Sequence, residues 1–304
     1  MLEECLTLLR SAGDEGAKVF VDATFGAGGH TAALLDAVPR SSVLAIDADP
    51  EAVRRADALA RRYPGRLRSA HGNYGDIEKL LAAAQIDQVD AVLYDLGISS
   101  LQLGGEQRGF SFVADEPLDM RLDPTSQAAT ASDLLSTLPQ DKLESILRDF
   151  GDERRARPIA RSIVRRRPRL EVWRTSDLVA AVWSAFGKDA QRGHERIHPA
   201  TRTFQALRIA VNAELENLRR SLHDALAHLK PRGRIVAISF HSGEDRVVKH
   251  AFREFEHEGV SVTITRKPVR PSAAETRANP RSRSAKLRAT ERVVAAAAAQ
   301  RGHG

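Results

Sequence analysis

The stretch Val19-Phe-Val-Asp-Ala-Thr-Phe-Gly-Ala-Gly-Gly-His30 decides the fold. It opens with a short apolar run typical of a buried β-strand and continues into three glycines, just before a helical pattern. A glycine-rich turn between a first strand and a first helix is typical of an open α/β sheet, where ligands bind in the crevice beside the turn. The stretch therefore predicts a ligand-binding strand, turn and helix.

The first hundred residues repeat this pattern. Short β-like runs alternate with helical patterns or loops, which predicts a parallel sheet with right-handed connections. The predicted strands are 19–23, 43–47, 67–71 and 91–96. The predicted helices between them are 31–38, 50–62 and 77–84, the second opening with Asp49 as its N-cap and Pro50 at its first position.

The alternation stops between residues 104 and 198, where we expect loops and helices but no strand. One long helix over 203–229 then ends at Pro231 and Gly233. The helices predicted within the gap are 141–150, 155–165 and 175–186, and beyond the long helix we expect strands 234–240, 260–266 and 285–292 with a helix at 246–256. The sequence thus predicts a helical insertion between the fourth and fifth strands of one sheet. Its expected bounds are 105–198, between core segments 1–104 and 199–304.

Two carboxylates flank the glycine turn. Asp22, at the end of the first strand, is suited to an ammonium group, and Asp47, at the tip of the second, to ribose hydroxyls. A dinucleotide site needs Gly-x-Gly-x-x-Gly, but Thr31 takes the third position after Gly26 and Gly28. A nucleoside methyl donor has no phosphate and suits this shorter loop better. The alternative is a tight turn without a ligand.

The charge is unevenly distributed in this chain of 304 residues with a net charge of +6. Residues 266–292 carry a net charge of +7 and residues 148–174 carry +6, whereas residues 1–147 carry −10. Two basic segments favour a polyanionic partner; the alternative is a pair of solvated arginine-rich faces.

Other features narrow the class of protein. The apolar runs are too short to cross a membrane and no signal peptide is apparent, so a cytoplasmic protein is expected. Cys5 is the only cysteine, which excludes an intrachain disulfide and a cysteine-rich zinc site. We expect Cys5 to lie in a leading helix remote from every strand end, so it is a poor candidate for a covalent catalytic nucleophile.

A zinc-peptidase pattern, His-Glu-x-x-His, is present at His194-Glu-Arg-Ile-His198. Pro199 disfavours a helix at the second histidine, so no metal site is expected.

The start of the long helix offers Arg202 as a contact for an RNA phosphate, with Phe204 in the core. His241 and Ser242 either contact substrate or cap the turn after the fifth strand. Trp173 and Trp183 are expected in the core of the insertion.

Together, the motifs resemble those of the bacterial 16S ribosomal RNA cytosine-N4 methyltransferase family. The resemblance covers nearly the whole chain and is carried by Gly-Ala-Gly-Gly-His30, Asp95-Leu-Gly-Ile-Ser-Ser100, Arg108-Gly-Phe-Ser-Phe112, Pro117-Leu-Asp-Met-Arg121, His198-Pro-Ala-Thr-Arg-Thr-Phe-Gln205, Ser239-Phe-His-Ser242 and Asn279-Pro-Arg-Ser-Arg-Ser284. It implies a class I, Rossmann-like methyltransferase sheet with a helical insertion. It also implies S-adenosylmethionine as cofactor and methylation of the N4 amine of cytosine 1402 in 16S rRNA of the small ribosomal subunit.

The family's donor site transfers onto this chain residue by residue, and Asp22 and Gly26 are added to it from the local pattern. The transferred residues are Gly28, Gly29, His30, Asp47, Tyr74, Asp95 and Gln102. Tyr74 replaces a phenylalanine and keeps an aromatic face for adenine. Gly243 replaces a customary leucine, and the family's His-x-Pro-Val-Leu segment does not precede Leu2.

Asp95 is the candidate catalytic residue, because it ends the fourth strand beside the expected methyl group; alternatively it only holds the donor or caps the next turn. Predicted substrate contacts are Arg202, His241, Ser242, Arg281 and Arg283. A non-catalytic RNA-binding module on a methyltransferase core is the competing hypothesis, which the intact donor loop disfavours. A homodimer is compatible with the sequence, which defines no oligomeric state.

Overall fold

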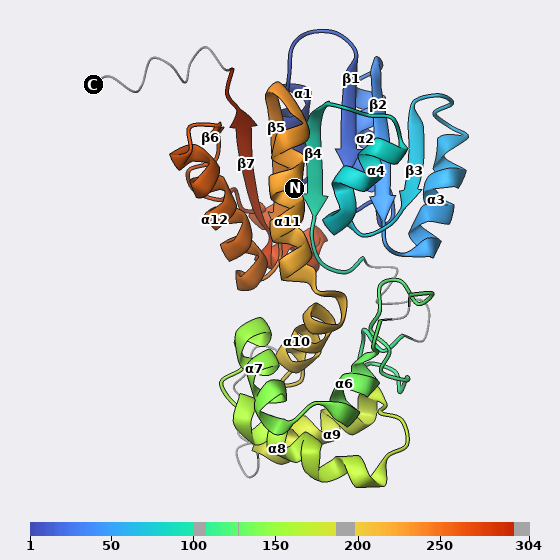
Figure 1. Cartoon of the computed structure of the whole chain (residues 1–304), viewed down its shortest axis with the longest axis vertical. Coiled ribbons are helices and arrows are strands. Elements are labelled where there is room, and N and C mark those ends of the chain that lie inside the picture. Colours follow the sequence, from blue (N-terminus) through green and yellow to red (C-terminus); the bar gives the residue numbers. More distant parts are fainter. Residues whose placement is uncertain (100–107, 127, 187–197, 295–304) are drawn as a thin grey trace. The chain divides into compact units, whose positions relative to one another are not determined.

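The computed structural model describes residues 1–99, 108–126, 128–186 and 198–294. Contacts divide the chain into two compact units (Figure 1). The first, here called the sheet unit, combines Met1–Ser99 with Leu215–Gly304, and the second, the helical unit, is Ser100–Glu214.

The sheet unit is built on a seven-stranded sheet of order β3-β2-β1-β4-β5-β7-β6. Its strands are β1 (Lys18–Asp22), β2 (Ser41–Asp47), β3 (Leu67–His71), β4 (Val89–Asp95), β5 (Leu229–Ser239), β6 (Ser261–Thr263) and β7 (Lys286–Arg292). The first five strands in this order are parallel, and β7 is antiparallel to both neighbours. The chain order reverses between β1 and β4, so the ends of these two strands flank the switch point where open sheets bind ligands. The predicted α/β class is confirmed.

Helices cover both faces of this sheet (Figure 1). On one face lie α1 (Leu2–Arg10), α2 (Gly29–Ala37) and α3 (Pro50–Ala60); on the other lie α4 (Ile77–Ala83), α11 (Glu214–His228) and α12 (Ser242–His257). Along β4, Ala91 and Leu93 enter the first core, whereas Val92 and Tyr94 enter the second. Burial on both faces explains why the strands read as continuous apolar runs.

The helical unit consists of short packed helices. They are α6 (Ala131–Thr137), α7 (Gln140–Gly151), α8 (Ala156–Arg166), α9 (Thr175–Phe186) and α10 (Thr201–Asn212). Helix α7 packs on α8 and α10, and α8 packs on α9. Trp173 is fully buried and Trp183 half-buried. The sequence did not predict α6, which begins with a capping box formed by Thr130 and Asp133.

The prediction of one long helix over 203–229 is wrong. The chain forms α10 and α11, and between them Ala213 adopts a left-handed conformation with φ of 48°. Because α10 packs on α7, the helical unit extends to Glu214, beyond the expected bound at residue 198. Arg202 and Phe204 consequently belong to the helical unit.

The stop expected at Pro231 and Gly233 falls inside β5. Pairing of β4 with β5 jumps from Val89 and Leu229 to Ala91 and Arg234, so the chain bulges between these registers, with Arg232 at φ of 62°. The smaller elements are η1 (Tyr74–Asp76), η2 (Arg167–Arg169), α13 (Ala273–Ala278) and η4 (Pro280–Ser284). Among the described residues, no helix is both long enough and apolar enough to span a membrane.

Candidate active site

The glycine turn links β1 to α2 through two left-handed residues. Gly26 has φ of 55°, and Gly28, the N-cap of α2, has φ of 79°. A Cβ on Gly28 would also lie 2.5 Å from the ring of Phe25. A Cβ on Gly29 would meet no atom within 4 Å. The first helical residue therefore faces open space, as a ligand-binding turn requires.

Asp22 holds the turn from inside the sheet. Its side chain is buried, and its two oxygens accept hydrogen bonds from the Thr31 hydroxyl at 2.7 Å and the Thr24 amide at 3.2 Å. Burial raises the pKa of Asp22. Thr31, which replaces the third glycine of a dinucleotide motif, thus has a structural partner. The contacts of Asp22 fix the shape of the turn.

Asp47 ties the end of β2 to the same turn. Its carboxylate accepts hydrogen bonds from the Gly26 amide at 2.7 Å and the Asp49 amide at 2.9 Å. Burial raises the pKa of Asp47 to about 6. Each oxygen thus carries one backbone donor, and a carboxylate oxygen has capacity for a second. Asp49 caps α3, as expected, by accepting a hydrogen bond from Glu51.

Tyr74 follows the next strand, β3, in η1. Its ring is half-buried and meets Tyr94 edge to face, with centroids 6.1 Å apart. The buried Tyr94 hydroxyl is in turn hydrogen-bonded to Ser221 at 2.7 Å. These contacts hold the Tyr74 ring in one orientation, as an aromatic wall for a base requires.

Asp95 ends β4 beside the glycine turn. Its amide donates a hydrogen bond to the Thr24 hydroxyl at 2.7 Å, which joins the two strand ends at the switch point. Its Oδ2 lies 3.4 Å from Nδ1 of His30 on α2. Its Oδ1 is buried and has no hydrogen-bond partner within the described part of the chain. An orphaned buried acceptor marks a place where a bound group donates a hydrogen bond.

Cys5 lies next to this pair, contrary to the expectation that it is remote from every strand end. The fully buried thiol on α1 is hydrogen-bonded to His30, and burial raises the pKa of Cys5. Burial by itself lowers the pKa of His30, but the hydrogen bonds with Asp95 and Cys5 outweigh it and raise that pKa. Helix α1 thus packs against the imidazole, and the raised pKa favours the protonated form of His30 beside Asp95.

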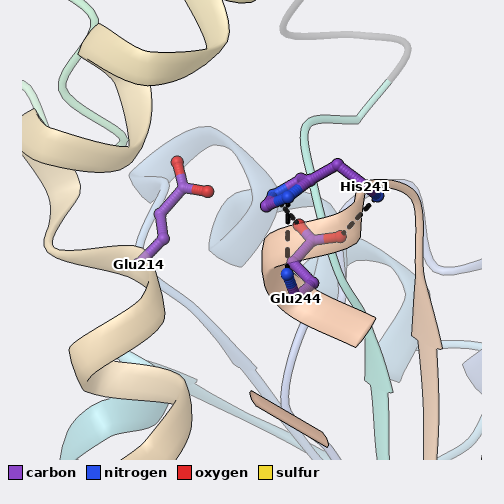
Figure 2. A group of neighbouring side chains, drawn as sticks. All are labelled: Glu214, His241 and Glu244. Carbon is purple, nitrogen blue, oxygen red and sulfur yellow. Dashed lines mark hydrogen bonds and ion pairs between the residues drawn. The ribbon is translucent and has the colours of Figure 1, made fainter. Parts of the chain in front are cut away.

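His241 and Ser242 begin α12 at the end of β5, near the same edge of the sheet. Nδ1 of His241 accepts a hydrogen bond from the Glu244 amide at 3.4 Å, while Glu244 Oε2 accepts from the Phe240 amide at 2.7 Å and the His241 amide at 3.3 Å. Figure 2 shows this reciprocal cap between His241 and Glu244. The capping role of His241 is present, and a contact of His241 with substrate stays a prediction. Ser242 is exposed.

The other predicted residues that the structure describes belong to α10 and η4. Arg202, in α10, donates a hydrogen bond to the Asp152 carbonyl at 3.5 Å, and Phe204 is buried, as expected. Arg281 and Arg283 are exposed in η4. Gln102 lies outside the described residues.

The zinc-peptidase pattern is only partly described, because His194 and Glu195 also lie outside the described residues. The described histidine, His198, precedes α10 and stacks on Phe112, with ring centroids 4.5 Å apart. Its Nδ1 accepts a hydrogen bond from the Ala200 amide at 3.2 Å. These contacts place His198 among the aromatic residues of the helical unit.

Comparison with known families decides the kind of protein. The model of the MraW methylase family matches residues 1–293. The chain belongs to this family. The methylase resembles Ribosomal RNA small subunit methyltransferase H from Thermomicrobium roseum, with 47% identity over 310 residues covering 97% of this chain and 93% of the relative. The protein of the same name from Methylobacterium nodulans is 44% identical over 311 residues, covering 97% and 90%.

Solved structures also match at low identity. A putative methyltransferase from Streptococcus mutans, in complex with SAH, has a TM-score of 0.47 and 11% identity, covering 96% of the methylase and 97% of the other chain. An rRNA methylase from Streptococcus thermophilus has a TM-score of 0.45 and 10% identity, covering 96% of both chains.

Family membership confirms the resemblance seen in the sequence, and with it a methyltransferase that uses S-adenosylmethionine. Sequence reasoning missed three residues at this site: Thr24, Thr31 and Cys5. Thr24 and Thr31 flank the glycines and carry hydroxyls, so their hydrogen bonds at the turn could have been predicted from the sequence. The position of Cys5 depends on how α1 packs and had no local signal.

Proposed function

We propose that the methylase transfers a methyl group from S-adenosylmethionine to the exocyclic N4 amine of cytosine 1402 in 16S rRNA of the small ribosomal subunit. The observation that carries this proposal is the buried Oδ1 of Asp95 at the switch point, which accepts no hydrogen bond from any described residue. An amine that reacts there has hydrogens to donate, and none of the described residues donates one to this oxygen. The names of the relatives support the RNA class, and the resemblance supports the nucleotide.

The residues present fit the methyl donor. Open space beside Gly29 admits a nucleoside close to the backbone, and Asp47 retains acceptor capacity for ribose hydroxyls. Tyr74, which follows the neighbouring strand β3, supplies an aromatic face for the adenine base. We assign the donor site to Gly26, Gly28, Gly29, His30, Asp47, Tyr74, Asp95 and Gln102, with Asp22 shaping the turn.

S-adenosylmethionine supplies an electrophilic methyl group on a sulfonium sulfur. The cytosine amine is a poor nucleophile because its lone pair is delocalised into the ring. Asp95 Oδ1 accepts a hydrogen bond from this amine, favours a pyramidal nitrogen and takes the proton lost when the N–C bond forms. His30 engages Oδ2 and leaves Oδ1 directed to the amine. A base inside a helix cannot reach this edge, so the target nucleotide is flipped or single-stranded.

The direct test is nucleoside mass spectrometry of small-subunit rRNA from cells with and without the gene. We expect N4-methylcytidine to disappear from the fragment that contains cytosine 1402 and to return with the wild-type gene. An unchanged fragment in the deletion strain would disprove the proposed target.

Asp47→Ala is expected to weaken donor binding by about 1–3 kcal/mol, the scale for the loss of charge-assisted hydrogen bonds to hydroxyls. Isothermal titration calorimetry with S-adenosylmethionine measures this change. Asp36→Ala, an exposed acidic residue on α2, is the matched control and should bind normally. Equal affinity of Asp47→Ala and wild type would remove Asp47 from the donor site.

The basic segment 266–292 contains side chains that form ion pairs within the protein and side chains that form none with a described residue. Lys286 and Arg288 both pair with Asp245, at 2.9 and 2.7 Å. Arg281 and Arg283 are exposed and show no ion pair with a described residue. We therefore assign phosphate contacts to Arg281 and Arg283, with the helical unit as a second RNA-recognition surface.

Arg281→Gln/Arg283→Gln should reduce the slope of log K against log salt by about 1.4 for a single-stranded RNA, or about 0.7 per lost phosphate contact. Fluorescence anisotropy over a salt series measures the slope. Arg40→Gln/Arg61→Gln, which removes two exposed charges elsewhere on the sheet unit, is the control. The same slope in both double variants would make the two arginines a solvated face.

A further inference from the structure

A groove with a volume of about 450 Å³ lies between α11 and α12, on the face of the sheet that these helices cover. Its polar lining comes from Arg219 and His223 on α11 and from Arg246, His250 and Glu254 on α12. These residues are spaced four apart on each helix, so they share one face. The apolar part of the lining is Val247 and Ala251. None of these residues belongs to the donor site.

The groove has an excess of positive charge. Its one acidic residue, Glu254, lies 3.6 Å from Nε2 of His223. His223 is further fixed by a contact of Nδ1 with the Arg219 carbonyl at 2.9 Å and by an edge contact with Phe255. Arg219 and Arg246 are exposed, and the described residues provide no hydrogen bond or ion pair to either guanidinium. Two uncompensated guanidinium groups therefore face one concavity.

The position of the groove relates it to the reaction. Helix α11 runs antiparallel to β5, which follows it, and α12 begins where β5 ends (Figure 1). Both helices therefore start at the edge of the sheet that carries Asp95. Arg219 lies about 7.5 Å and Arg246 about 6 Å along their helix axes from those starts, at a rise of about 1.5 Å per residue. The groove thus opens within about two helical turns of that edge.

The chemistry of the groove selects its ligand. Guanidinium groups match the paired oxygens of a phosphate, and a pair on neighbouring helices can hold one phosphate or two successive ones. We propose that this groove binds the phosphodiester backbone of the RNA strand that carries the target nucleotide. The proposal rests on the proposed function for its substrate and adds a contact surface to it. The groove positions the strand and takes no part in methyl transfer.

The test compares Arg219→Gln/Arg246→Gln with Arg40→Gln/Arg61→Gln. Both double variants remove two exposed positive charges from the sheet unit, and only the first alters the groove. We expect the KM for small subunits isolated from cells that lack the enzyme to rise about tenfold in the groove variant, with kcat unchanged. The salt slope for a single-stranded RNA should fall by about 1.4. Calorimetric affinity for S-adenosylmethionine should equal that of the wild type, which shows that the fold is intact.

Equal KM values and equal salt slopes in the two double variants would overturn the groove assignment. A second result would also overturn it: inorganic phosphate binds the wild type but not the groove variant, and RNA does not displace this phosphate. The groove would then be a small-anion site. Failure of the proposed function gives a different result, since the wild type would then methylate no subunit. The RNA-binding comparison needs no catalysis, so it still decides whether the groove binds RNA.

Discussion

Asp95→Asn is expected to lower the single-turnover rate of methyl transfer by about 10²–10⁴-fold, the range for a positioned general base. Asparagine keeps the shape and one acceptor oxygen of the side chain, but it loses the charge and cannot take the proton from the amine. Rapid quench with saturating donor and small subunits measures the rate. Calorimetric affinity for S-adenosylmethionine should change by much less.

His30→Gln is the companion variant to Asp95→Asn. It removes the imidazolium beside Oδ2 and leaves Oδ1 in place, so its rate should fall less than that of Asp95→Asn. A catalytic role for Asp95 is disproved if Asp95→Asn loses donor affinity but turns over normally at saturation. Asp95 would then only hold the donor.

Arg208→Met is expected to destabilise the helical unit by about 3–5 kcal/mol, the cost of leaving one charge of a buried pair without its partner. Arg208 and Glu214 are each less than 10% exposed and form a bidentate ion pair. Its distances are 2.7 Å between Nε and Oε1 and 2.8 Å between Nη2 and Oε2. Urea unfolding followed by tryptophan fluorescence reports this unit alone. The reason is that Trp173 and Trp183 are the only tryptophans in the chain.

The double variant Arg208→Met/Glu214→Leu is the matched control, because it removes both charges and should recover most of the lost stability. An unfolding midpoint of Arg208→Met equal to that of the wild type would show that the pair contributes nothing. A midpoint of the double variant as low as that of the single variant would show that packing, and not the unpaired charge, causes the loss.

Much of the sheet could be predicted because its signals are local. β3 has the predicted bounds, and the other three strands of the first hundred residues differ from the prediction by one or two residues at an end, since buried parallel strands are short apolar runs between turns. The carboxylates Asp47 and Asp95 could be placed for the same reason, because each ends such a run.

The break between α10 and α11 could not be predicted from local signals. Ala213 is a good helix former, and its left-handed conformation depends on distant residues. The Asn212 side chain accepts a hydrogen bond from the Leu122 amide and donates one to the Met120 carbonyl, both at 2.8 Å. Arg208 and Glu214 then join the two sides of the break.

The same limit applies to the site. Cys5 and His30 meet only because α1 and α2 pack on one face of the sheet. The groove between α11 and α12 could not be predicted either, because the sequence predicted α11 only as the second half of the long helix. Contacts between residues far apart in the chain leave no periodic pattern in the sequence.

The place of the helical unit between β4 and β5 has a consequence for synthesis. Strands β1 to β4 can pair once the first hundred residues have emerged, but the partner for the other side of β4 begins only at Leu229. Ribosomes add about 5–20 residues per second, so roughly 130 further residues take about 7–26 s. Throughout that delay β4 is an apolar strand with one unpaired side, which invites aggregation of the nascent chain. The length of the insertion thus determines how long the nascent chain can aggregate through the unpaired side of β4.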